Sequence, residues 1–267
     1  MVLESLFPEK KIVSRPVDML MLGFVVSFVS VFVSYFVFPK YAGIITPLIT
    51  ALAMAPLFNR LFEDEEDEID QVAEKRLVEG FFARHGDIIW MFTLFFIGNF
   101  LAIFLISVAL PDQLLQTVFE PQLADINAIQ SLASASGAAV HPDLADMIIL
   151  NNLKVMLFAF MLSFLFGTGA VFILSWNASI LALFLANYVR QGLYHTFLLT
   201  TTGIFPHAAV EMVAYFLAGI AGGILSVGMV REDFMSPEFN LMFKDSVLLL
   251  LLALAAVFIG AYIEVGL

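Results

Sequence analysis

The sequence has no cysteine, and only 13% of its 267 residues are charged. The absence of cysteine excludes disulfides, thiolate metal sites and a cysteine nucleophile. The scarcity of charge excludes an ordinary soluble enzyme, because soluble globular domains have about 25% charged residues. Hydrophobic residues instead make up 61% of the chain, and the mean hydropathy is +0.96. This composition predicts an integral membrane protein.

Seven predominantly apolar stretches are long enough to cross a bilayer, since a transmembrane helix needs about 20 such residues. They cover 18–38, 44–62, 88–110, 148–174, 177–199, 207–229 and 246–264. The fourth and fifth stretches are separated only by a short join at Ser175-Trp176-Asn177. We therefore predict an all-α bundle of seven transmembrane helices, which forms a single integral membrane domain over 1–267 and is located in the cell membrane.

Basic residues are unevenly distributed between the segments that connect these stretches. If the N-terminus is inside, the outer segments carry only Lys40. The inner segments then carry nine basic residues: Lys10, Lys11, Arg15, Arg60, Lys75, Arg76, Arg84, Arg231 and Lys244. Because cytoplasmic loops are enriched in Lys and Arg, this bias predicts an inside N-terminus and an outside C-terminus.

Two connecting segments are long enough to have structure of their own. Residues 60–87 contain ten acidic and four basic residues, which gives −6 of the chain's net charge of −12. Their acidic block begins at Glu63 and suits a helix N-terminus, so we predict an amphipathic inner-surface helix that ends near Gly86. Residues 111–147 contain two apolar stripes and predict one or two short helices. This outer segment either caps the bundle or docks another protein.

Polar side chains within the apolar stretches are the main candidates for a functional site, because such residues are costly in a bilayer. The predicted fifth span has a polar face with the spacing of one helix side. Two further spans place polar groups at a similar depth in the outer half of the bilayer. The candidate residues are Asn151, Asn152, Lys154, Asn187, Arg190, Gln191, Tyr194, His195, His207 and Glu211.

Three interpretations of this polar cluster compete. In the first, Glu211 pairs with Arg190 or Lys154 and fixes helix packing, because an unpaired carboxylate in lipid would be costly. In the second, the groups line a cavity that binds a solute, a lipid headgroup or an ion. In the third and weakest, His207 and Glu211 are two metal ligands or an acid/base pair of an intramembrane hydrolase. A metal site requires three or four ligands, and no second histidine-rich motif supplies them, so no metal or cofactor is predicted.

Small residues in the fourth and sixth spans predict close helix packing, because they let helix backbones approach in lipid. Gly219 and Gly223 form a GxxxG pair in the sixth span. The packing candidates are Gly167, Gly169, Ala218, Gly219, Gly222 and Gly223. We favour internal packing for them over homodimerisation.

Short motifs in the second half of the chain resemble those of the stage II sporulation protein M family of integral membrane proteins. They are Asn151-Asn152, the Phe166-Gly167-Thr168-Gly169 stretch, Asn177, and Gly203-Ile204-Phe205-Pro206-His207 with Glu211. Ala178 and Ala208 stand where the family usually has glycine. The resemblance covers roughly 150–230, a family-like core. It implies a membrane scaffold, since the namesake of the family holds cell-wall hydrolases and partner proteins during engulfment in spore-formers.

The sequence and this resemblance together favour a non-enzymatic membrane scaffold that recruits partners. The expected partners are membrane lipid, other membrane or envelope proteins and a second copy of the chain, with no nucleic acid. The alternative is a transporter or channel for a small solute, lipid or ion that uses a polar cavity in the outer half of the bilayer. A scaffold tolerates a dry, fully paired polar cluster, whereas a transporter needs room and an exit on the inner side.

Overall fold

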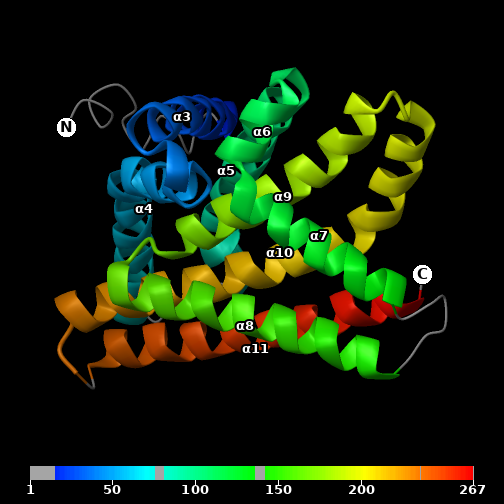
Figure 1. Cartoon of the computed structure of the whole chain (residues 1–267). Coiled ribbons are helices and arrows are strands. Elements are labelled where there is room, and N and C mark those ends of the chain that lie inside the picture. Colours follow the sequence, from blue (N-terminus) through cyan, green and yellow to red (C-terminus); the bar gives the residue numbers. More distant parts are fainter. Residues whose placement is uncertain (1–15, 76–80, 136–141, 235, 267) are drawn as a thin grey trace.

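The computed structural model describes residues 16–75, 81–135, 142–234 and 236–266, and these are almost entirely helical (Figure 1). The elements are α3 (Pro16–Val37), η1 (Pro39–Tyr41), α4 (Ala42–Lys75), α5 (Phe81–Ala109), α6 (Asp112–Val118), α7 (Glu120–Ala135), α8 (Pro142–Phe166), α9 (Ala170–Arg190), α10 (Tyr194–Arg231) and α11 (Pro237–Gly266). Seven of these helices have the length and apolar composition to cross a membrane, which confirms the predicted all-α bundle of seven spans. The orientation of the termini stays a prediction.

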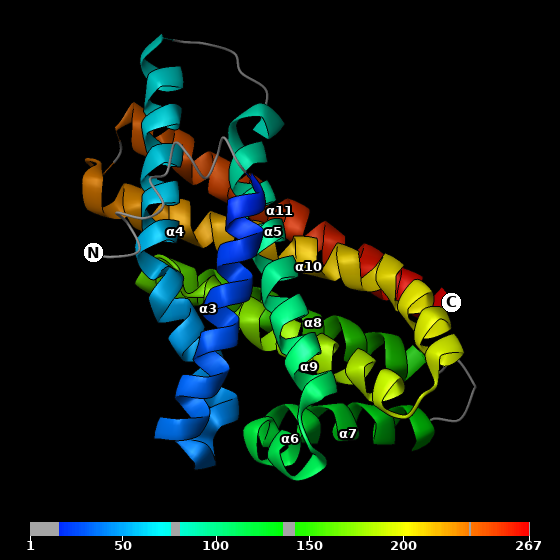
Figure 2. The same ribbon diagram turned by 90° about the horizontal axis from the view of Figure 1, so that it is seen from above.

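The spanning helices form two groups that cross at an angle. Figure 2 shows α3, α4 and α5 with their axes roughly aligned, and α8, α10 and α11 passing obliquely behind them. Helix α9 contacts α4, α5, α8 and α10 and joins the two groups. The main hydrophobic core lies where the groups meet, and within it the ring of Phe92 packs against the rings of Phe58 and Phe216. Burial is therefore greatest at the crossing and least on the outer helices.

Helices α6 and α7 pack across one end of the bundle, which we call the cap end (Figure 2). Val118, Phe119 and Ile126 join a second hydrophobic cluster with residues from α3, α5 and α9. The buried Gln122 side chain also donates a hydrogen bond from Nε2 to the Gly43 carbonyl at 2.7 Å. The predicted short helices in 111–147 are thus present and dock on the bundle. Residues 136–141 of this segment lie outside the described residues.

The predicted turn between the fourth and fifth spans is in the wrong place. Ser175-Trp176-Asn177 lies inside α9, where Asn177 donates a hydrogen bond to the Ile173 carbonyl one turn earlier. The chain instead turns at residues 167–169, between α8 and α9. Gly167 has φ +69°, a left-handed conformation that favours glycine. The next turn is likewise earlier than predicted, because α9 ends at Arg190 and α10 begins at Tyr194.

The acidic segment does not begin a separate helix. Helix α4 continues without a break from Ala42 through Glu63 to Lys75, so the acidic block extends a membrane-spanning helix at its C-terminal end. His85 and Gly86 lie inside α5 rather than at the end of a surface helix. The predicted inner-surface helix over 60–87 is therefore wrong in its boundaries, and residues 76–80 lie outside the described residues.

Helix α10 is long and bends part-way along its length (Figures 1 and 2). Pro206 lies inside it and lacks the N–H that an α-helix needs, which accounts for a bend. The part after the bend is largely buried, from Ala214 to Ile224. The part before it forms a hairpin with α9 that projects from the body (Figure 1), and its Tyr194 and Leu198 are 64% and 61% exposed. His207 therefore lies within α10. The sequence analysis had placed it at the start of a helix, which is wrong.

Candidate functional site

A hydrogen-bonded cluster joins the Asn-Asn pair of α8 to the Pro-His-x-x-x-Glu stretch of α10. Asn152 donates from Nδ2 to Oε1 of Glu211 at 2.6 Å. The hydroxyl of Tyr215, one helical turn further along α10, donates to Oδ1 of Asn152 at 2.9 Å. Both ends of the Asn152 amide are therefore used, and Asn152 is only 6% exposed. The structure thus brings two of the predicted site residues together and adds Tyr215, which the sequence analysis did not select.

Helix α11 closes the third side of this cluster. A Cβ atom placed on Gly260 would lie 3.0 Å from Cγ of Glu211 and 3.7 Å from the His207 carbonyl oxygen. Glycine at this position therefore allows the α11 backbone to approach the carboxylate closely. One turn later, Glu264 is near enough to interact electrostatically with Glu211 and Tyr215. The cluster therefore contains two carboxylates from two facing helices.

His207 borders the same cluster from the turn before Glu211. Its Nδ1 atom is buried and has no hydrogen-bond partner in the described part of the chain. The imidazole can donate or accept hydrogen bonds, and the two carboxylates can accept hydrogen bonds or bind a cation. Among the residues that the structure describes, no three His, Cys, Asp or Glu side chains are grouped as metal ligands.

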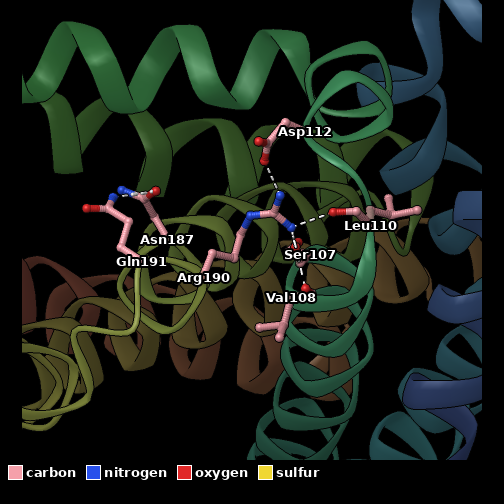
Figure 3. A network of polar contacts seen from close by, with 7 residues as sticks. All are labelled: Ser107, Val108, Leu110, Asp112, Asn187, Arg190 and Gln191. Atoms are coloured by element: carbon pink, nitrogen blue, oxygen red, sulfur yellow. Dashed lines mark hydrogen bonds and ion pairs between the residues drawn. The ribbon is translucent and has the colours of Figure 1, made fainter.

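Arg190 belongs to a separate network at the cap end, shown in Figure 3. Its Nη1 donates to the carbonyls of Ser107 at 2.6 Å and Leu110 at 2.5 Å, and more weakly to that of Val108 at 3.4 Å. Its Nη2 forms an ion pair with Asp112. Carbonyls at a helix C-terminus have no partner within their helix, and a cation near them is favourable. Arg190 therefore caps the end of α5 and ties α9 to the start of α6.

The predicted pairing of Glu211 with Arg190 or Lys154 is wrong. Glu211 is bonded to Asn152, and Arg190 is bonded to α5 and Asp112. The physical reason is the earlier end of α9, which places Arg190 at a helix terminus instead of deep in a span. Lys154 lies on the exposed side of α8.

The predicted polar face of the fifth span is divided between two helices. Asn187 and Gln191 are hydrogen-bonded to each other at the end of α9, where Gln191 Nε2 donates to Asn187 Oδ1 at 2.9 Å (Figure 3). Tyr194 and His195 begin α10 and are exposed. These residues do not form one surface with Glu211. Asn151 is exposed and makes only a long contact of 3.5 Å with Asn152.

The small residues of α10 pack inside the bundle. An added Cβ would lie 2.5 Å from the Ala170 side chain at Gly219, 2.4 Å from the Phe160 carbonyl at Gly222, and 2.3 Å from the Phe62 ring at Gly223. Ala218 is fully buried. At the turn, added Cβ atoms on Gly167 and Gly169 would collide with Asn59 and Leu162. The close contacts of Gly219, Gly222 and Gly223 hold α10 against α4, α8 and α9.

Two buried polar pairs within the spans were missed by sequence reasoning. Asn99 of α5 donates from Nδ2 to Oγ of Ser175 on α9 at 2.5 Å. His85 Nε2 lies 3.3 Å from Oδ2 of Asp245 and joins the start of α5 to α11. An amide within the apolar run 88–110 was the available signal for Asn99. Asp245 had a weaker signal, because it borders the apolar stretch that begins at residue 246.

The family model for stage II sporulation protein M matches residues 90–266, more than half of the chain. Searches of curated proteins and of solved structures found no match. The matched region is larger than the stretch 150–230 identified from the motifs: it begins within α5 and includes α11, whereas α3 and α4 lie outside it. The Asn152–Glu211–Tyr215 cluster lies wholly within this region. Because the match covers more than half of the chain, the chain belongs to the stage II sporulation protein M family.

Proposed function

We propose that this protein is a non-enzymatic membrane scaffold that recruits other membrane or envelope proteins. The observation that carries the proposal is the use of polar side chains as links between helices. Asn152 links α8 to α10, Arg190 links α9 to α5, and Gln122 links α7 to α4. Interhelical hydrogen bonds of this kind stabilise helix association in lipid. A bundle fixed in this way offers a rigid platform with exposed outer surfaces.

Family membership supports the same proposal. The family takes its name from stage II sporulation protein M. The scaffold role of that namesake is carried over to this chain as part of the proposal. The docked helices α6 and α7 supply a second surface for partners at the cap end, beside the outer faces of the membrane helices.

The test is recovery of stoichiometric partners from native membranes. The tagged chain is purified in mild detergent, and co-purifying proteins are quantified by mass spectrometry against the variant Gln122→Ala, which loosens the cap. A scaffold retains defined partners at a fixed ratio. Recovery of the folded chain without any stoichiometric protein would contradict the proposal.

One observation favours a second candidate function, transport of a small solute, lipid or ion. Glu211 and Glu264 approach each other from α10 and α11 where α10 bends, and paired carboxylates in a membrane protein often mark an ion pathway. The corresponding test is flux into proteoliposomes that contain the purified chain. Flux that is lost in Glu211→Gln and kept in the exposed control Asp112→Asn would favour transport over the scaffold.

A further inference from the structure

Helix α8 has an outward stripe with the pattern of a helix-packing surface, and none of the described helices covers it. Only 22% of the 18-residue apolar stretch of α8 is buried, compared with 39–67% of the corresponding stretches in the other candidate spans of the described chain. Six of its exposed residues recur at spacings of three and four: Met147, Leu150, Lys154, Leu157, Met161 and Leu165. This is the spacing by which one helix packs along another. We call these six residues the α8 stripe.

Lys154 interrupts the α8 stripe with a positive charge. Within the described residues, Lys154 has no hydrogen bond or ion pair. It follows Asp146, the first residue of the candidate span, by eight residues, which is about 12 Å along the helix axis. Its neighbours on the stripe, Leu150 and Leu157, are 55% and 52% exposed and apolar. A lysine at such a depth is costly unless it finds an anionic partner or reaches the interface.

A second copy of the chain is a poor occupant of the α8 stripe. Two copies inserted with the same orientation are related by an axis along the membrane normal. Packing of one stripe on the other would therefore place the two Lys154 side chains at the same depth, facing each other. Like charges in a medium of low dielectric repel strongly. The charge that complements the stripe is a carboxylate on a different helix.

We propose that the α8 stripe binds a transmembrane helix of another membrane protein and that an Asp or Glu of that helix pairs with Lys154. This inference rests on the proposed scaffold function and specifies the chemistry of the partner. The apolar residues of the stripe supply the packing surface, and Lys154 selects the partner by charge and depth. The opposite face of α8, where Asn152 is bonded to Glu211, stays attached to α10.

The experiment measures binding of model helices to the full chain in phosphatidylcholine vesicles. The probes are leucine-rich single-span peptides with Glu, Gln or Leu about 12 Å below one end. Because the chain has no cysteine, Asn127→Cys on the exposed side of α7 gives a single site for the fluorescence donor. We expect the Glu peptide to bind roughly tenfold more tightly than the Gln and Leu peptides. Lys154→Gln should abolish this preference, and Lys154→Arg should retain it.

Matched bulky substitutions locate the binding surface. Leu157→Trp, within the stripe, should weaken binding of the Glu peptide, whereas Leu251→Trp on α11, where the side chain is 57% exposed, should not. Equal binding of the three peptides, a preference that survives Lys154→Gln, or an equal effect of Leu251→Trp would overturn the proposal. So would a disulfide-linked dimer of Leu157→Cys chains that excludes the peptide, since the stripe would then join two copies.

The outcome is separable from that of the scaffold test. If the chain retains no stoichiometric partner from native membranes yet prefers the Glu peptide, the scaffold function fails and the binding surface stands. If partners are retained without any peptide preference, the scaffold stands and this surface is not where they bind.

Discussion

The cluster at Glu211 and the network at Arg190 each hold one charged side chain of an otherwise apolar chain, but with different kinds of partner. Glu211 accepts a hydrogen bond from the neutral amide of Asn152, whose carbonyl oxygen is bonded in turn by Tyr215. Arg190 is held by main-chain carbonyls at the end of α5 and by the exposed Asp112. The first arrangement is made by side chains between helices, and the second depends on where a helix ends.

This difference shows that a carboxylate within an apolar stretch can be held by a neutral amide, without a basic side chain as its partner. Carbonyl groups at a helix C-terminus can neutralise a guanidinium, because they carry partial negative charge and have no partner in their own helix. An amide can satisfy a carboxylate in the same way. The two regions should therefore respond to mutation independently, and the Glu211 region should be the more sensitive because it is more deeply enclosed.

The largest effect is expected for Asn152→Leu. The substitution removes the partner of both Glu211 and Tyr215, and leaving a buried acceptor unsatisfied costs about 2–3 kcal/mol. The measurement is the free energy of unfolding in detergent, with Asn151→Leu as the control because Asn151 is exposed. Equal destabilisation by the two variants would mean that Asn152 does not have this role.

Gly222→Ala should destabilise the same region by about 2 kcal/mol. The added Cβ would lie 2.4 Å from the Phe160 carbonyl and would push α10 away from α8. Gly203→Ala is the matched control on the same helix, because no atom lies within 4 Å of its added Cβ, and it should raise helix stability slightly. Unchanged thermal stability of Gly222→Ala would contradict the close approach of α8 and α10.

Arg190→Met should have a smaller effect, a loss of about 1–2 kcal/mol, because water or lipid headgroups at a helix end replace part of what the guanidinium supplies. The loss should be local to the cap end. Hydrogen exchange should therefore increase at the last turn of α5 and in α6, and remain unchanged around Glu211. Faster exchange in the Glu211 region instead would show that the two regions are coupled.

Asp112→Asn should change stability by no more than about 0.5 kcal/mol. The side chain of Asp112 is 85% exposed, and exposed ion pairs contribute little. The carbonyls of Ser107 and Leu110 still hold Arg190 in this variant. A thermal shift as large as that of Arg190→Met would show that the ion pair, and not the helix end, holds the guanidinium.

Much of the fold was predictable because hydropathy and length alone identify membrane spans. The seven helices and the short helices of the cap follow from apolar runs and their periodicity. The turn between α8 and α9 was misplaced because Ser175 and Asn177 are polar residues between two apolar runs, a pattern typical of a turn. Within α9 their side chains are satisfied by Asn99 and by the Ile173 carbonyl, so they need no turn. Gly167-Thr168-Gly169 was the better turn signal.

The site was predictable only in part, because the positions of its residues depend on where the helices begin and end. Asn152 and Glu211 were recognised as candidates, and both lie in the region that the family model matches. The position of Arg190 depended on the boundary of α9, so an error in one turn moved it from the end of a helix to the middle of a span. Partners that are main-chain carbonyls, such as that of Leu110, leave no trace in residue type.

The central claim is that Asn152, and not Arg190, is the partner of Glu211, and two double-mutant cycles on unfolding free energy test it most directly. The cycle of Asn152→Leu with Glu211→Leu should give a coupling energy of about 1–2 kcal/mol, because the double variant removes both hydrogen-bonding groups together. The cycle of Arg190→Met with Glu211→Leu should be additive within about 0.5 kcal/mol, because the two residues share no partner. Coupling in the second cycle and additivity in the first would contradict this account.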